Sequence, residues 1–421
     1  MNKIFILCLL LSLVGFSRLS AQTDSTSVAS ESAEDEEKLI RELSFVPMPV
    51  LAANPAMGFM YGLAPSASWM MGDDASTHRS SLVSSIIYTT KKQFLFFIKT
   101  NIFLKDDSWN LMGDWRYFAT SQPTYGLGTG PSSNTLASNG FEYDDGSYSK
   151  GINEAQMMDF NYLRFHETAL KRVGDTRFFA GLGYHLDYHY NIDDKLLGLG
   201  NDGIIDAGDT VTSHYAYSTY YGFDPESYLL SGISINGLFD SRNNMINPTD
   251  GRYGFISFHI NPTFFGSDKN STSLWLEYRD YFRMSQKRPR HLIGVWTYAN
   301  FVTSGEVPYL DLPAIGWDQF GRSGRAYPQG RFRGQSIAYA EAEYRFPLMV
   351  NSDLIGGVIF ANATTATNED TDLNLFEYVD PGVGLGLRVM INKKSQTNIS
   401  LDYAWGRYGA QGFYLNVNET F

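Results

Sequence analysis

Residues 336–346 read SIAYAEAEYRF and alternate between two kinds of side chain. The small or aromatic side chains are Ala338, Ala340, Ala342, Tyr344 and Phe346, and the polar ones between them are Tyr339, Glu341, Glu343 and Arg345. A period of two predicts a β-strand with one apolar and one polar face. Strands of soluble sandwiches also alternate, but they do not normally place three charged residues in series on one face. The stretch therefore favours a membrane barrel wall, with apolar side chains toward lipid and acids toward a polar lumen.

The same alternation extends outward from this stretch over residues 45–421. We identify fifteen candidate strands, at 58–70, 79–90, 93–104, 107–119, 155–170, 176–190, 227–240, 251–264, 271–285, 289–302, 335–348, 353–363, 380–392, 396–406 and 411–421. A single-chain bacterial barrel has an even number of strands, so we predict sixteen, with the missing one at 45–54 or within 120–150. The predicted fold is all-β, a transmembrane antiparallel β-barrel. Short links such as 392–396 should face the periplasm, and long ones such as 191–226 and 303–334 should face outward or fold into the lumen.

Composition excludes several classes of protein. The chain has 421 residues, of which 19% are charged and 15% are aromatic, as expected of a strand-rich protein that keeps one face out of water. Its formal net charge of -12 argues against nucleic acid as a partner, since nucleic-acid binders need basic patches. The single cysteine, Cys8, lies in a segment that we expect to be removed. The mature chain would then have no disulfide and no thiolate metal site.

The N-terminus has the pattern of an exported protein. Lys3 precedes an apolar run from Ile4 to Phe16, and the small residue Ala21 precedes Gln22, which predicts a cleaved signal peptide at 1–21. Residues 22–44 are acidic and rich in Ser and Thr, so we expect a disordered linker. The barrel would occupy 45–421. No later stretch is long and apolar enough for a spanning helix, so a chain that spans the membrane must do so as a closed barrel.

Three motifs in the chain resemble those of a known family. The first, a turn motif, consists of Asp240, Arg242, Pro248 and Gly251. The second is Arg331, Phe332, Arg333 and Gly334, which is similar to the Val-Arg-Gly-aromatic tip of the family's sixth extracellular loop. The third is a C-terminal assembly signal of Gly412, Phe413, Leu415, Val417 and Phe421. Together the motifs resemble the BamA/TamA superfamily of outer-membrane barrels, the bacterial surface antigen family. The resemblance implies a location in the outer membrane of a Gram-negative cell. It also implies contact with outer-membrane lipid, the barrel assembly machinery and client outer-membrane proteins.

The resemblance also implies an ion pair inside the barrel. In the family the sixth loop folds back into the lumen, where its arginine pairs with acids on the inner wall. Here Arg333 would be that cation, with Glu341 or Glu343 as its acceptor, because the alternation turns both acids inward. Gly334 would permit a tight backbone turn beside it. The pair would serve either as a lock beside a lateral seam or as an ordinary brace of the wall.

The sequence also departs from the family pattern. Gln335 follows Arg-Gly where the family has an aromatic residue, and Asn362 stands where it usually has Asp on the next strand. With Asn362 in place of Asp, one acid fewer would be available to pair with Arg333. Family members with established insertase roles carry periplasmic receptor domains before the barrel, and here we expect only the linker.

An enzymatic interpretation rests on His185, Asp187 and His189, which share one face at strand spacing. Two imidazoles and a carboxylate could ligate a divalent ion if a fourth group converged. A polar lumen face produces such a row without catalysis, and the chain has no Gly-x-Ser-x-Gly elbow, no His-Glu-x-x-His and no glycine-rich phosphate cradle. We therefore expect no enzymatic activity, no metal and no cofactor.

Together these features predict an outer-membrane barrel that assists the insertion or export of other proteins. Its mechanism, implied by the resemblance, would be a weak seam between the first and last strands that opens sideways. The alternative is a passive pore or a structural barrel. A seam opener tolerates a plugged lumen, whereas a pore needs an open one.

Overall fold

The computed structural model describes residues 43–421 apart from 48, 55–57, 74–75, 132–140, 144, 153, 202–204, 245–246, 320 and 393–396. The expected signal peptide and nearly all of the expected linker lie outside the described residues.

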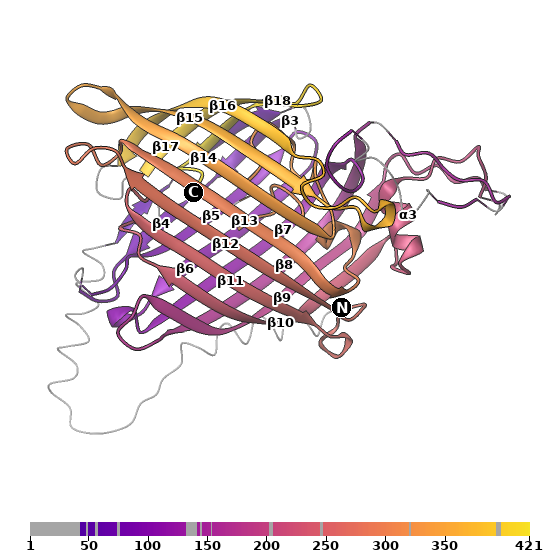
Figure 1. The fold of residues 1–421 in the computed structure, drawn as a ribbon, viewed down its shortest axis with the longest axis horizontal. Helices are drawn as coiled ribbons and strands as arrows, with labels where there is room; N and C mark the ends of the chain where they lie inside the picture. Colours follow the sequence, from indigo (N-terminus) through magenta and orange to yellow (C-terminus); the bar gives the residue numbers. More distant parts are fainter. Residues whose placement is uncertain are drawn as a thin grey trace, which may run out of the picture. The chain divides into compact units, whose positions relative to one another are not determined.

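The described part is built mainly from strands (Figure 1). The strands are β1 (Ser44–Val46), β2 (Pro49–Asn54), β3 (Gly58–Leu63), β4 (Ser66–Trp69), β5 (Ser80–Thr89), β6 (Phe94–Phe103), β7 (Trp109–Thr124), β8 (Gln156–Arg172), β9 (Phe178–Asp194), β10 (Ser227–Asp240), β11 (Gly251–Asn261), β12 (Ser271–Arg283), β13 (Leu292–Gly305), β14 (Ser336–Met349), β15 (Ser352–Ala366), β16 (Asp380–Asn392), β17 (Thr397–Gly406) and β18 (Gln411–Val417). The helical elements are α3 (Ser213–Tyr220) and the short 3₁₀ turns η2 (Lys105–Asp107), η3 (Thr263–Phe265), η4 (Tyr309–Asp311) and η5 (Glu369–Thr371). Among the described residues, no helix is long and apolar enough to cross a bilayer.

From β5 to β18, each strand pairs antiparallel with the next strand along the chain. β1 and β2 pair with β4 and β3 respectively, and both β3 and β4 pair with β5. β1–β2 and β3–β4 are thus two interrupted strands, broken next to Pro47 and Pro65, which lack the N–H that a ladder needs. Counting each as one gives the sixteen strands expected from the sequence, and β1–β2 is the strand sought at 45–54. Residues 120–150 instead extend β7 and begin a connection.

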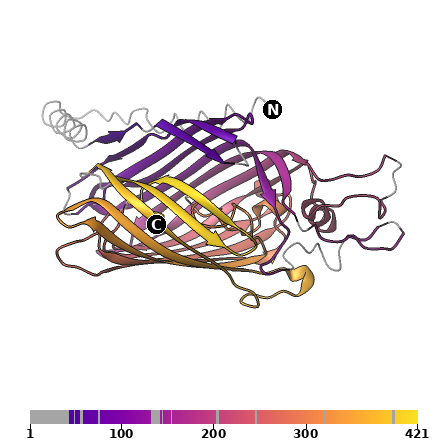
Figure 2. The same ribbon diagram turned by 90° about the horizontal axis from the view of Figure 1, so that it is seen from above.

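The two ends of the sheet meet without joining. β18 lies beside the first strands, as the yellow and indigo ribbons show in both views (Figure 1, Figure 2). Among the described residues, however, no ladder of paired residues links β18 to β2, so the sheet is not closed. Every other neighbouring pair of strands is joined by a register of paired residues.

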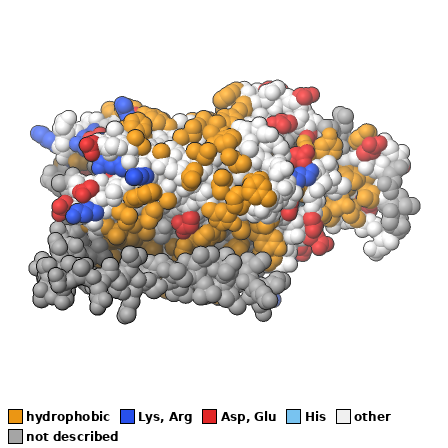
Figure 3. All heavy atoms as spheres, turned by 90° about the horizontal axis from the view of Figure 1, so that it is seen from below, with side chains coloured by type: hydrophobic (Ala, Val, Ile, Leu, Met, Phe, Trp, Pro, Cys, Tyr) orange, Lys and Arg blue, Asp and Glu red, His pale blue; other side chains and the backbone are white. Residues whose placement is uncertain are grey.

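The outer face of the wall is apolar. Along β16, Val383, Leu385 and Leu387 are all about half exposed, whereas Arg388 on the opposite face is buried. Apolar side chains form a broad band across the wall, with charged side chains toward the two ends of the view (Figure 3). This is the distribution of a barrel whose outer face contacts lipid.

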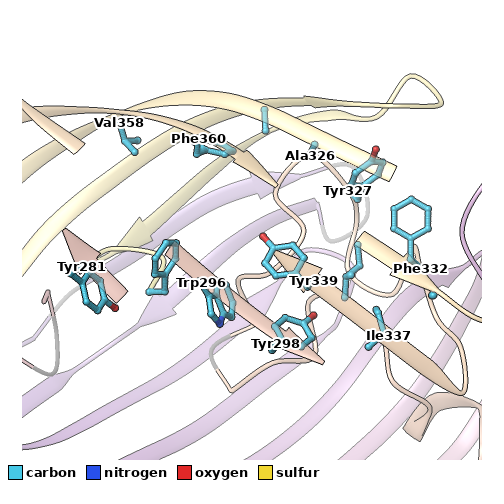
Figure 4. Packing of buried hydrophobic residues seen from close by; sticks show 14 of the residues in the cluster. Tyr281, Trp296, Tyr298, Ala326, Tyr327, Phe332, Ile337, Tyr339, Val358 and Phe360 are labelled. Atoms are coloured by element: carbon cyan, nitrogen blue, oxygen red, sulfur yellow. The ribbon is translucent and has the colours of Figure 1, made fainter. Parts of the chain in front are cut away.

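Part of the interior is packed with side chains. One cluster of buried side chains joins the inner faces of β12–β15 to the connection between β13 and β14 (Figure 4). Its large members include Trp296, Tyr298, Tyr339 and Phe332. The connections 191–226 and 303–334 leave the same end of the antiparallel sheet, and the second folds into the lumen, as expected.

Candidate functional site

The candidate site is the loop between β13 and β14, residues 306–335. Its two arms hydrogen-bond to each other, from Ile315 N to the Phe332 carbonyl at 3.1 Å and from Gly330 N to the Ile315 carbonyl at 2.9 Å. The connection after β7 joins it, since Gly128 N donates to the Arg333 carbonyl at 2.6 Å. The loop is therefore a folded insert in the lumen that is anchored at several points.

Arg325 is the cation that ties this loop to the wall. Its guanidinium donates to Glu341 on β14 at 2.6 Å, to Glu343 on the same strand, and to Asp402 on β17 at 2.7 Å. It also lies 3.5 Å from the centroid of the Phe360 ring. Burial alone would lower the pKa of Arg325, but the three carboxylates raise it well above its ordinary value. A buried guanidinium shared by three acids stays charged and links strands that are not neighbours.

The expected pairing of Arg333 with these acids is therefore wrong. Arg333 is fully buried, and it donates instead to the carbonyl oxygens of Tyr309, at 2.7 Å, and Leu312, at 3.4 Å. Its guanidinium carbon lies 5.1 Å from the centroid of the Tyr309 ring. Burial lowers the pKa of Arg333 from its ordinary value. Arg333 thus stabilises the fold of the loop itself, and Arg325 makes the contact with the wall.

The other residues of the loop motif pack around Arg333. The Arg331 guanidinium lies over the rings of Tyr125, at 4.6 Å, and Tyr408, at 5.1 Å, while Phe332 is buried edge-on against Tyr327. A Cβ on Gly334 would lie 2.1 Å from the Thr367 carbonyl oxygen. Gly334 is needed, but for this close approach to the end of β15 and not for the predicted tight turn.

Asn362 has a different role from the acid that it replaces. Its Nδ2 donates to the Arg325 carbonyl oxygen at 2.9 Å and to Glu341 Oε2 at 3.4 Å. An ionised carboxylate has no proton to donate, so only the amide can make both contacts. Asn362 therefore binds the loop backbone rather than its guanidinium.

A chain of ion pairs continues from the loop toward the C-terminus. Arg388 on β16 donates to Asp402 at 2.5 Å and to Glu419 at 2.6 Å. Arg345 donates to Glu343 at 2.6 Å. Asp402, Arg388 and Glu419 were not among the predicted site residues, although the same alternation that placed Glu341 inward applies to Asp402 and Arg388. Arg325 lies in a loop and gives no periodic signal.

The family follows from the sequence match. Residues 172–421 match the model of the Omp85 superfamily domain, which is more than half of the chain. The chain belongs to the Omp85 superfamily. A comparison with curated proteins found no match.

Two solved structures are similar to this Omp85 chain, and the first of them supports its fold. BamA from Haemophilus ducreyi, solved without POTRA domains 1–3, is similar over 96% of this chain and 79% of its own, with 14% identity and a TM-score of 0.52. CdiB from Acinetobacter baumannii is similar over 91% of this chain and 67% of its own, with 11% identity and a TM-score of 0.48. At this identity the BamA likeness supports the barrel fold and nothing finer.

The turn motif of this Omp85 barrel forms a compact unit between β10 and β11. Asp240 and Arg242 are both buried and paired at 2.6 Å, with the Arg242 guanidinium 4.4 Å from the centroid of the Tyr253 ring. Gly251 has a φ of +94°, and a Cβ there would lie 2.2 Å from the Ser241 carbonyl oxygen. Pro248 is buried as well. Of the predicted turn residues, Asp240, Arg242 and Gly251 are thus brought together.

The C-terminal signal of this Omp85 barrel divides between the two faces of the wall. Phe413 and Leu415 on β18 point outward, with Phe413 75% exposed. The period of two puts Phe421 on the same outward face as Phe413. In the structure, however, Phe421 is only 4% exposed and packs inside against Trp296. The cause lies at Asn418, whose φ of +72° turns the chain away from the strand. Asn tolerates this left-handed conformation better than most residues.

The residues of the row His185, Asp187 and His189 each contact different neighbours. Asp187 accepts from Tyr162, Arg164 and His166, whereas His185 contacts Asn261. His189 stacks on the Tyr162 ring, with centroids 4.4 Å apart. Within the described ranges, no three His, Cys, Asp or Glu side chains are arranged to hold a metal ion.

Proposed function

We propose that this Omp85 barrel assists the insertion or translocation of other proteins at the outer membrane. The observation that carries the proposal is that, among the described residues, no ladder joins β18 to β2, beside a lumen that the loop partly fills. A strand edge with free N–H and C=O groups pairs readily with another strand. A client strand could pair there from the side, whereas passage through the lumen would require the loop to leave.

The Arg325 network supports a role for the loop at this edge. Arg325 contacts Asp402 on β17, and β17 is the only paired neighbour of β18 among the described residues. The loop thus holds the penultimate strand while the last strand keeps one edge unpaired. In this proposal the loop sets the position of the edge, and clients and the barrel assembly machinery are its partners.

The first test is depletion of the protein followed by quantitative proteomics of the purified outer membrane. Several barrels or surface lipoproteins should fall together while their synthesis continues. Complementation with the wild-type gene should restore them, and Arg325→Ala should not. Arg407→Ala, which removes an arginine with a half-exposed side chain at the β17–β18 link, is the matched control and should restore them fully.

An unchanged outer-membrane inventory would contradict the proposal. If only solute uptake shifted, and the purified barrel conducted ions steadily in a planar bilayer, the passive pore would replace it. The insertion proposal expects little steady conductance from the wild type, because the loop occupies the lumen.

Export through a cleaved signal peptide is part of the same proposal. The mature protein should begin at Gln22, which N-terminal sequencing of the outer-membrane form would detect. Recovery of that form with Met1 still present would contradict cleavage.

The proposal includes no enzymatic step. Replacing His185 and His189 together by Gln should leave the outer-membrane inventory unchanged. If the double variant folds stably but does not restore the outer-membrane proteins after depletion, these histidines take part in chemistry inside the lumen.

A further inference from the structure

A cavity lies inside the barrel between the loop and the middle of the wall. Its volume is about 230 Å³, and residues of β7–β13 line it together with Asp311, Trp317 and Gln319 of the loop. A second cavity of about 80 Å³ shares Asp311 and Trp317 with the first, so the two adjoin. A single buried water needs only about 10–15 Å³. The space is therefore large enough for a small organic ligand.

The carboxylates that line this cavity already have basic partners. Among the described residues there are four, and three of them pair with an arginine at 2.5–2.7 Å, namely Asp114 with Arg116, Asp187 with Arg164 and Glu277 with Arg279. The fourth is Asp311, whose Oδ1 lies 3.3 Å from His189 Nδ1. A charged ligand would find no counter-ion that is not already engaged, and burying an unpaired charge is costly. The cavity therefore favours a neutral ligand.

Two polar atoms of the loop face this cavity without a partner. Among the described residues, Asp311 Oδ2 and Trp317 Nε1 are buried and make no hydrogen bond. The Asp311 side chain is only 5% exposed. Buried polar atoms normally have a partner, so these two indicate one that enters the cavity. The indole N–H donates and the carboxylate oxygen accepts, and a hydroxyl group can satisfy both.

Two indole rings supply flat apolar surfaces beside these atoms. Trp275 on β12 stacks on Tyr298, with ring centroids 4.7 Å apart, and its N–H donates to Glu277 at 3.3 Å. Trp317 packs edge-on against Tyr162, with centroids 5.4 Å apart. Both indoles border the two cavities and are only partly buried. Fixed rings beside a few convergent polar groups suit a ligand with an apolar face and polar edges.

Cyclic sugars have this combination of surfaces. One face of a pyranose ring presents C–H groups that can pack on an aromatic ring, while the hydroxyl groups at its edge both donate and accept. We propose that the cavity is a binding site for a neutral sugar, which packs on Trp275 and bonds through its hydroxyls to Asp311 and Trp317. The bound sugar joins the loop to the wall. The site stands on these contacts whether or not the barrel inserts proteins.

The test is saturation-transfer NMR on the folded full-length protein in lauryldimethylamine oxide, a detergent without a sugar headgroup. The probes are glucose, galactose and N-acetylglucosamine, with the open-chain alcohol sorbitol as the ligand control. At least one of the three sugars should bind saturably, with the strongest signal on the C–H protons of one ring face. Sorbitol should bind about tenfold more weakly, because it has no rigid face. Saturable binding of none of the three sugars, or equal affinity for sorbitol, would overturn the proposal.

Variants place the bound sugar in the cavity. Trp275→Leu removes the ring face and should weaken binding about tenfold, whereas Trp275→Tyr keeps a ring and should recover part of the affinity. Trp317→Phe removes only the N–H donor and should weaken binding about fivefold, as expected for the loss of one hydrogen bond. Heat-modifiable mobility in gels shows that each barrel is folded.

The matched control is Trp405→Leu. Trp405 lies on β17, is 42% exposed on the outer face, and should be replaceable without any change in sugar affinity. An equal loss in Trp405→Leu, or wild-type affinity in both Trp275→Leu and Trp317→Phe, would contradict the site. If Trp275→Leu does not fold, Trp317→Phe decides, because it keeps an aromatic ring in the loop.

Methyl glycosides distinguish the two sources of such a sugar. A free monosaccharide that the cavity encloses should bind more weakly as its methyl glycoside, because the added group meets the wall. The terminal residue of a longer glycan should bind equally well in both forms, because its anomeric position must stay open to the rest of the chain.

Discussion

The middle of the sheet and its end are stabilised in different ways. β7, β8 and β9 have 16, 17 and 17 residues and pair along nearly their whole length. β17 and β18 have 10 and 7 residues, and the second edge of β18 carries no ladder among the described residues. Backbone hydrogen bonds alone therefore hold the middle of the wall more firmly than its end.

Buried charges follow the same division. In the middle of the sheet, ion pairs join adjacent strands, as Arg164 on β8 does with Asp187 on β9 at 2.7 Å. At the end of the sheet, Arg325 joins the loop to β14 and β17, and Arg388 joins β17 to the C-terminal tail. The short strands thus depend on side-chain links across the lumen. An edge held by a few such links can be released without unfolding the rest of the wall.

The largest effect should come from removing the loop cation. Arg325→Ala removes the loop cation from three buried carboxylates: Glu341 loses its arginine, while Glu343 and Asp402 keep Arg345 and Arg388 respectively. Breaking a buried pair in this way costs about 3–5 kcal/mol. The unfolding midpoint in urea, followed by gel mobility, should fall accordingly. Arg325→Lys keeps the charge but not the forked geometry, so its loss should be intermediate. If Arg325→Ala unfolded at the same urea concentration as the wild type, the role given to the loop would be contradicted.

The next largest effect should come from placing a charged side chain on the outer face of the wall. The effect should be similar in the middle of the sheet and near its end. Leu182 on β9 and Leu385 on β16 are both more than half exposed, which a lipid-facing side chain must be. Arginine at either position should cost about 2–4 kcal/mol near the bilayer midplane. The fraction that folds into lipid vesicles measures this, with Leu→Ala at each site as the control. Equal folding of the arginine and alanine variants would show that these faces do not contact lipid.

The alternation in the sequence predicted the wall because each strand repeats the same two-faced environment. It placed Glu341 and Glu343 inside, and both are buried. It also predicted an extra strand, which the structure finds at β1–β2. These features depend only on local period and on the even strand number of such barrels.

The loop cation and the C-terminus were not predictable in the same way. Which arginine of the loop reaches the acids depends on the path of the backbone, for which Ala326 adopts a φ of +105°. Phe421 keeps the sequence period of an outward residue, but one left-handed residue at Asn418 places it inside. Both errors arise where contacts distant in sequence override the local pattern.

A smaller effect should follow from filling the space beside Gly334. Gly334→Ala places a Cβ against the backbone of Thr367, and neither backbone can yield as a flexible side chain would. Overpacking of this kind costs about 1–3 kcal/mol. Faster protease cleavage within residues 306–335 should accompany the loss, because the loop must shift. Gly254→Ala meets no neighbour and should change neither measurement.

The smallest effect should come from an exposed ion pair at the end of the sheet. Arg407 lies 3.6 Å from Asp380, and its side chain is 53% exposed, so water and salt screen the pair. Arg407→Ala should therefore shift the stability by no more than about 1 kcal/mol, and added salt should abolish the difference. The same urea titration measures it beside Arg325→Ala. A loss as large as that of Arg325→Ala would mean that any charge near the last strands stabilises them. The predicted contrast instead requires burial, because water cannot take the place of a desolvated guanidinium beside its acids, as it can at an exposed pair.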